Sequence, residues 1–167
     1  MRNLFAVLLL CCSCMGADVI AAPIACDTEL REKLISLYTA YLQAAKTEDI
    51  SAVKRFSTIE DATEVTQAEK SGNDKTKIGR MMYAFSPRLE GAREIRCEQS
   101  QNRARLIITH EVRSETNGKP NVPRDGFGVV MFKQQGKEWK VGKKASTQPF
   151  ADAPLNDLLK YEALQLP

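Results

Sequence analysis

The chain has 167 residues, enough for one domain with a sizeable hydrophobic core. Its hydrophobic fraction of 43% and charged fraction of 27% are those of an ordinary soluble globular protein. A formal net charge of +3 is too small to indicate a nucleic-acid partner. Several basic residues of the second half predict a solvated sheet face with basic strand ends, rather than an anion-binding surface: Arg103, Arg105, Arg113, Lys133, Lys137, Lys140, Lys143 and Lys144.

Residues 1–22 have the pattern of a secretory signal peptide. Arg2 supplies a positive start, residues 4–10 form a short apolar run, and small residues follow. Cleavage is expected after Ala21, because cleavage one residue later would place Pro23 beside the cut. No segment approaches the ~20 apolar residues that a membrane-spanning helix needs. The sequence therefore predicts a protein exported to the periplasm or the extracellular space, without a membrane span.

The five cysteines divide between this leader and the expected domain. Cys11, Cys12 and Cys14 fit a lipoprotein signal poorly, so a lipid anchor is the weaker interpretation. In an exported protein the remaining pair, Cys26 and Cys97, most simply forms one disulfide. Such a bridge contributes roughly 4 kcal/mol in the chain-entropy model and would link the first helix to a strand. Two thiols and one remote histidine give no zinc spacing, so neither a metal nor a cofactor is expected.

The first half of the expected domain, residues 23–146, has helical periodicity. A long amphipathic helix should follow Asp27, and Asp49 or Thr47 should cap a shorter second helix that ends near Phe56. The pattern weakens between residues 57 and 75, where only one further helical turn is expected. A third helix should end before Pro87. The stripe of the first helix comprises Leu30, Leu34, Leu37, Tyr38, Tyr41, Leu42 and Ala45, and that of the third comprises Ile78, Met81, Met82 and Phe85.

The second half has the periodicity of strands. Residues 103–113 alternate so that Leu106, Ile108 and His110, the only histidine, share an inward face. The opposite face is expected to be wet, with Ile107 as its one apolar residue. A strand at residues 94–98 precedes this one, and a polar loop at 114–124 follows it. Residues 126–133 and 138–143 should form a hairpin with Trp139 and Val141 inward, before a tail at 147–167 with a short helix within residues 155–164.

These elements predict an α+β domain with two to three N-terminal helices packed on a curved antiparallel sheet of about four strands. The segments LYTAYLQAAKTEDISAVKRFST (37–58) and VVMFKQQGKEWKVGK (129–143) resemble the nuclear-transport-factor-2-like cone fold. This superfamily includes ketosteroid isomerase and many small exported bacterial proteins. The resemblance implies a long helix, a short acidic turn and a second helix across a curved sheet, with a cavity inside. The family's β-hairpin after the second helix has no counterpart here.

Three functions are compatible with this pattern. The first is an exported, non-enzymatic protein that binds a small apolar ligand or a protein, and a second copy of the chain is a further candidate partner. The second is a cone-fold enzyme with His110 as acid–base residue, against the simpler interpretation of a core histidine bonded to a carbonyl or tyrosine. The third is a periplasmic inhibitor or immunity protein against a secreted toxin. Candidate pocket residues are Tyr38, Tyr41, Met81, Met82, His110, Phe127, Met131 and Trp139.

Overall fold

The computed structural model describes residues 23–113, 115–116, 119–147 and 154–167. The predicted signal peptide at residues 1–22 lies outside the described residues. The helices are α1 (Thr28–Lys46), α2 (Ile50–Phe56), α3 (Ile59–Lys70), α4 (Lys75–Ala84) and α5 (Leu155–Leu158), followed by the 3-10 turn η1 (Glu162–Leu164). The strands are β1 (Ile24–Ala25), β2 (Glu94–Ser100), β3 (Arg103–Val112), β4 (Glu115–Thr116), β5 (Lys119–Pro120), β6 (Arg124–Gln135) and β7 (Glu138–Ser146).

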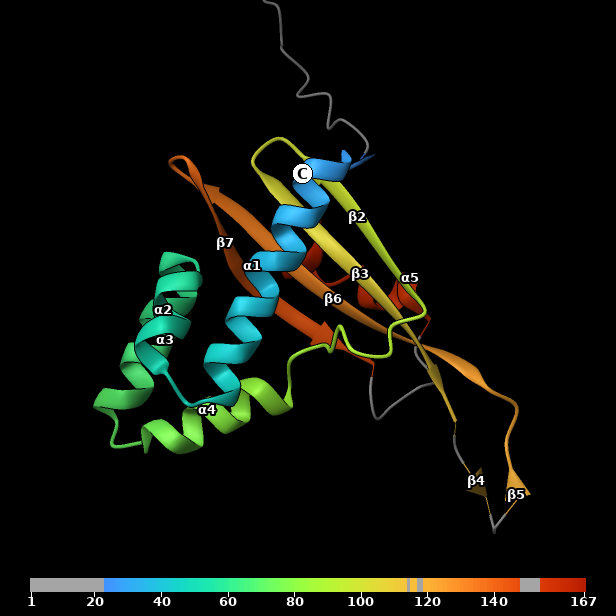
Figure 1. The fold of residues 1–167 in the computed structure, drawn as a ribbon, viewed down its shortest axis with the longest axis horizontal. Helices are drawn as coiled ribbons and strands as arrows, with labels where there is room; N and C mark the ends of the chain where they lie inside the picture. The colour runs from blue at the N-terminus through green and yellow to red at the C-terminus, as the bar shows by residue number, and fades with distance from the viewer. Residues whose placement is uncertain (1–22, 114, 117–118, 148–153) are drawn as a thin grey trace, which may run out of the picture.

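Five of these strands form one antiparallel sheet in the order β1-β2-β3-β6-β7. Helices α1 to α4 lie on one face of this sheet, and α5 lies on the other (Figure 1). The α+β class is therefore as expected, but the expected two to three helices and four strands are too few for the described residues. The segment 114–124, expected as a loop, contains the short hairpin of β4 and β5 at the far end of β3 and β6.

The long helix α1 supplies most of the apolar surface on the inner face. Asp27 caps it, accepting a hydrogen bond from the backbone N–H of Leu30 at 2.7 Å. Its stripe packs against the alternating inward residues of β3 and β6, as the sequence predicts. Members of this inner core include Leu34, Tyr38, Tyr41, Ala45, Leu106, Ile108, Val130, Phe132 and Val141, all of them almost fully buried.

Helix α3 corrects the expectation of a single helical turn after residue 57. It has 12 residues and begins at a capped terminus, where the Thr58 hydroxyl accepts a hydrogen bond from the backbone N–H of Asp61 at 3.3 Å. Glu60 and Asp61 occupy the first turn, where the helix dipole favours negative charge. The helix buries only Asp61 and Val65, so its sequence carries too narrow an apolar stripe to be recognised by periodicity.

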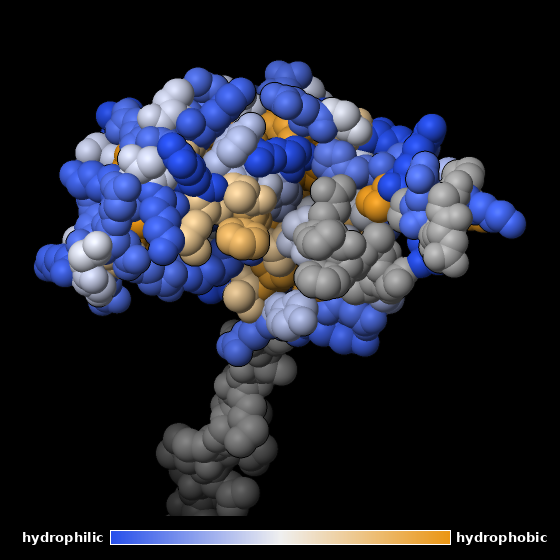
Figure 2. Space-filling model, turned by 90° about the horizontal axis from the view of Figure 1, so that it is seen from below, coloured by the Kyte–Doolittle hydropathy of each residue, from blue (hydrophilic) through white to orange (hydrophobic). Residues whose placement is uncertain are grey.

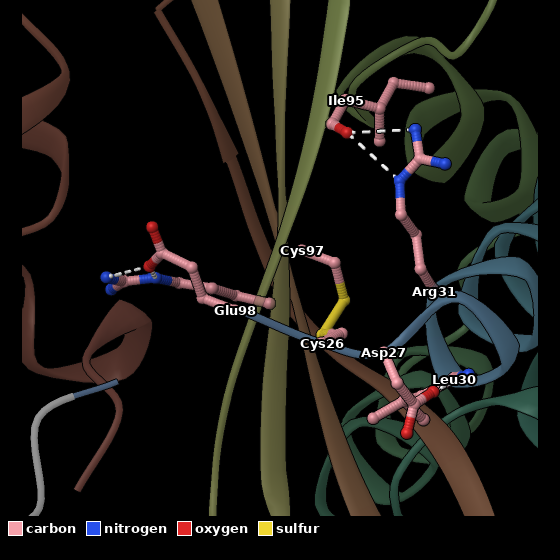
Figure 3. Close-up of a disulfide and its surroundings, with 8 residues drawn as sticks. Cys26, Asp27, Leu30, Arg31, Ile95, Cys97 and Glu98 are labelled. Carbon is pink, nitrogen blue, oxygen red and sulfur yellow. Dashed lines mark hydrogen bonds and ion pairs between the residues drawn. A yellow bond between two sulfur atoms is a disulfide. The ribbon is translucent and has the colours of Figure 1, made fainter. Parts of the chain in front are cut away.

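The Cys26–Cys97 disulfide, predicted from the sequence, is present and joins Cys26, the residue directly after the edge strand β1, to Cys97 in the neighbouring strand β2 (Figure 3). The two-residue strand β1, which the sequence does not predict, pairs with Glu98 and Gln99 near the C-terminal end of β2. Beside the bridge, the Arg31 guanidinium of α1 donates to the backbone carbonyl of Ile95 at 3.1 and 3.3 Å (Figure 3). The bridge and these hydrogen bonds fix the start of α1 against the sheet.

The middle of the outer face is buried, which corrects the expectation of a wet face there, whereas Arg103 and Glu111 are exposed as expected. Arg105, Ile107 and Thr109 are all buried, and leucines of the C-terminal residues 154–167 pack on β6 of the same face. Arg105 pairs with Glu98 at 2.6 Å and also donates to the backbone carbonyl of Leu164 at 3.1 Å. The leucines of this segment are spaced too irregularly for one helical stripe, and they fold as α5 and η1 rather than as one helix over 155–164. The outer cluster comprises Val129, Met131, Leu158, Leu164 and Leu166.

Candidate functional site

A hollow of the described surface lies where α3 and α4 meet the end of β7, and we call it the α4 cleft. Its volume is about 440 Å³, which falls within the range of small-molecule pockets. One side of the cleft is apolar and the other carries charged and hydroxyl side chains. The apolar side comprises Val65, Ala68, Ile78, Met81, Met82 and Phe85, and the polar side comprises Asp61, Glu64, Asn73, Lys77, Ser86, Lys143 and Lys144.

Most of the apolar side is the stripe of α4 that the sequence predicts, and Val65 and Ala68 of α3 complete it. Ile78 and Met82 pack inward, whereas Met81 is 50% exposed and Phe85 is 76% exposed. The face on which α4 lies carries a gathering of hydrophobic surface flanked by hydrophilic surface (Figure 2). Large apolar side chains gathered in an exposed hollow are typical of binding surfaces, and methionine adapts its shape to a ligand.

The polar side depends on an irregularity in β7. Val141 pairs with Phe132 and Lys144 pairs with Val130, so three steps along β7 match two steps along β6. One extra residue in β7 forms a β-bulge. Strict alternation from Trp139 and Val141 would place Lys144 on the outer face, but the bulge turns it to the inner face. The inward position of Lys144 therefore could not be predicted from the sequence, because a two-residue period places this lysine outward.

Lys144 is a half-buried cation without an acidic partner. Its Nζ donates to the backbone carbonyl of Gly142 at 3.1 Å and lies 4.6 Å from the centre of the Tyr41 ring. In the described part of the chain Lys144 forms no ion pair with a carboxylate. Burial lowers the pKa of its ammonium to about 8, because the charged form loses hydration, and the nearby Asp61 carboxylate only partly opposes this shift.

The carboxylates of the cleft are already engaged by the neighbouring lysine. Lys143 Nζ contacts Asp61 Oδ1 at 2.7 Å and Glu64 Oε1 at 2.6 Å. Asp61 is 7% exposed, and its second oxygen, Oδ2, has no hydrogen-bond partner among the described residues. The sequence gives no functional signal for Asp61, which lies in the first turn of α3. Lys143 is on the inward side by alternation from Trp139 and Val141, so it was the part of this ion pair that the sequence could predict.

The unpaired charge of Lys144 has a measurable effect on stability. Because its pKa is lowered in the folded protein, the unfolded chain binds the proton more tightly, which destabilises the fold below pH 8. We expect Lys144→Met to raise the free energy of unfolding at pH 7 by about 1–2 kcal/mol, after allowing for the lost contact with the Tyr41 ring.

The gain should shrink as the pH rises from 8 towards the ordinary lysine value of 10.5, because the folded wild-type protein then holds Lys144 in its neutral form and no longer buries a charge. Urea unfolding of wild type and variant at pH 7 and pH 10 measures this. Lys77→Met, which removes an exposed lysine of the same cleft, is the matched control and should leave the stability unchanged. A loss of stability in Lys144→Met at pH 7 would show that the cation is compensated.

Tyr38 and Tyr41 lie in the core next to the cleft and have no exposed surface. Their rings stack with centroids 5.9 Å apart, and burial raises the pKa of both hydroxyls. The Tyr38 hydroxyl donates to the backbone carbonyl of Pro87 at 2.7 Å. The two tyrosines therefore support the cleft from inside, whereas Met81 and Met82 line it.

His110 is placed away from the cleft, near the end of β3. Its Nε2 lies 2.8 Å from the backbone carbonyl of Arg88, as the core interpretation predicts, although the ring is half-buried rather than fully enclosed. The segment with Arg88 can cross the inner face because Gly128 has no side chain: a Cβ there would lie 2.4 Å from Pro87. His110 does not line the α4 cleft, and it has no hydrogen bond to a carboxylate among the described residues.

The remaining candidates are distributed over both faces of the sheet. Phe127 and Met131 pair with Thr109 and Arg105, so they lie on the outer face and cannot share a cavity with the tyrosines. Met131 belongs to the outer cluster with Leu158 and Leu164. Trp139 is half-buried and packs against the inner core, in agreement with its expected inward position.

The described residues form an α+β protein with an amphipathic surface hollow at α4. No family model, curated protein or solved structure gives a significant match to this chain. In the ranges that the structure covers, no group of three or more histidine, cysteine or acidic residues is arranged to hold a metal ion. A membrane-crossing helix would need to be longer and more apolar than any helix of the described residues.

Proposed function

We propose that this protein is an exported binding protein that takes up a small apolar molecule in the α4 cleft. The observation that carries the proposal is the partly exposed apolar side of the cleft, above all Met81 and Phe85. Covering these side chains with a ligand removes apolar surface from water, and this is the main source of affinity in such sites. The Cys26–Cys97 disulfide and the leader-like residues 1–22 support export.

We further propose that the chain is a member of the nuclear-transport-factor-2-like superfamily. Helices packed on one face of an antiparallel sheet support it, while α3 occupies the segment in which that family has a hairpin. A shared fold would not decide the function, so the binding proposal rests on the cleft alone. The enzyme alternative has less support, because the hydrogen bond of His110 is to a backbone carbonyl outside the cleft.

The binding proposal is tested with the uncharged fluorescent probe N-phenyl-1-naphthylamine. We expect the wild-type protein to bind it and Phe85→Glu to weaken binding by about tenfold or more, because a charge then occupies the apolar side. Ile59→Glu is the matched control: Ile59 is 69% exposed, comparable with Phe85, but does not line the cleft. Absence of probe binding, or equal binding by both variants and wild type, would refute the proposal.

A further inference from the structure

We propose that the ligand of the α4 cleft is an anionic amphiphile, whose single negatively charged head group binds Lys144 while its apolar body lies along α4. The inference rests on the proposed function and adds the chemical class of the ligand. It starts from an imbalance in the cleft, where an apolar side faces a cation that no acidic residue of the described chain pairs with.

Lys144 has donors to spare. An ammonium group has three N–H donors, and the structure assigns one to the carbonyl of Gly142. The Tyr41 ring, 4.6 Å from Nζ, stabilises the charge from one side only. A carboxylate, sulfate or phosphate oxygen that approached from the cleft would accept the remaining donors. It would also restore the charged form that burial disfavours.

The other charges facing Lys144 favour an anion over a cation. Asp61 and Glu64 both contact Lys143, so their charge is partly neutralised within the protein. With Lys77 at the rim, the lining holds three lysines and two carboxylates, a net charge of +1. The free Oδ2 oxygen of Asp61 would repel an anion placed directly against it, which locates the head group on the Lys144 side.

The depth of the cation favours a dispersed single molecule over a membrane surface. Lys144 is half-buried and Ser86 almost fully buried, whereas Met81 and Phe85 on the apolar side of the cleft are exposed. A head group that contacts Lys144 therefore lies deeper than the exposed apolar side chains that its chain would contact. A lipid that stays in a bilayer keeps its chains in the membrane. It therefore cannot place its head group beside Lys144 and its chain along α4 at the same time.

The test compares decanoate with decanol, which have the same chain length and differ in head-group charge, by displacement of N-phenyl-1-naphthylamine at pH 7. We expect the ratio of decanoate affinity to decanol affinity to be about tenfold higher in wild type than in Lys144→Met. Lys77→Met should keep the wild-type ratio, because it removes an equal charge from the rim. Comparing ratios cancels the different solubilities of the two compounds.

A second readout needs no variant. The affinity of wild type for decanoate should fall by about tenfold between pH 7 and pH 10, as Lys144 loses its proton, whereas decanol affinity should stay constant. Equal decanoate-to-decanol ratios in wild type and Lys144→Met would overturn the inference and leave the proposed function standing. So would tighter binding of decylamine than of decanoate, or Lys144-dependent binding to phosphatidylglycerol vesicles. Failure of decanoate to displace a probe that wild type binds would also overturn the inference alone, whereas absence of probe binding would overturn inference and function together.

Discussion

Removal of the Cys26–Cys97 disulfide should lower the free energy of unfolding by about 4 kcal/mol. The two cysteines are 71 residues apart, so the bridge restricts a long loop in the unfolded chain and raises its free energy. The test is urea unfolding of the double variant Cys26→Ser/Cys97→Ser, followed by the fluorescence of the single tryptophan, Trp139.

Wild-type protein treated with a reductant is the control for this variant, since it loses the same bridge but keeps both sulfur atoms. The two samples should agree closely in stability. The backbone hydrogen bond from Cys26 to Cys97, at 3.0 Å, and the Arg31 contacts should still hold α1 near the sheet when the variant is folded. A stability loss below about 1 kcal/mol would show that these contacts already fix the terminus without the bridge.

Replacing the Leu164 side chain by alanine should lower the free energy of unfolding by about 2–4 kcal/mol, although Leu164 lies only three residues before the last residue of the printed sequence. Leu164 is 2% exposed and packs with Val129 and Met131 on the outer face of the sheet. Leu164→Ala would leave a cavity there and loosen the segment whose carbonyl Arg105 contacts. Urea unfolding at neutral pH measures the loss.

Tyr161→Ala is the matched control for Leu164→Ala, because Tyr161 belongs to the same segment and is 65% exposed. It should change the stability by no more than about 0.5 kcal/mol. Equal stabilities of the two variants and wild type would mean that the C-terminal residues do not form part of the cooperative fold, and the outer face would then be wet, as the sequence alone suggested.

The elements with strong periodicity were predictable from the sequence. The stripe of α1, the strand β3 with Leu106 and Ile108 on its inner face, and the pairing of the two cysteines each follow from a local rule, and each is present. Helix α3 was largely missed because its contacts with the protein are few and partly polar. The covering of the outer face was missed because it depends on residues some 50 positions away from β3, which no local pattern reports.

The candidate site was predictable only on its apolar side. Met81 and Met82 were expected as pocket residues from the stripe of α4, and both line the cleft. Lys144 could not be assigned, because the β-bulge that turns it inward is a property of strand pairing. Tyr38 and Tyr41 were also expected as pocket residues. Core and pocket positions of a helix share the same periodicity, so the sequence pattern does not separate them. Their complete burial distinguishes the two interpretations.

The most direct test of the central claim is an NMR titration of the ¹⁵N-labelled, disulfide-bonded protein with decanoate. The account predicts that amide signals of α3, α4 and residues 142–146 of β7 shift together, with one dissociation constant. Signals of β1 and η1, which lie away from the cleft, should stay in place, and Lys144→Met should weaken the shifts while retaining their pattern. Shifts confined to the outer face or to the surroundings of His110, with α4 unchanged, would contradict the account.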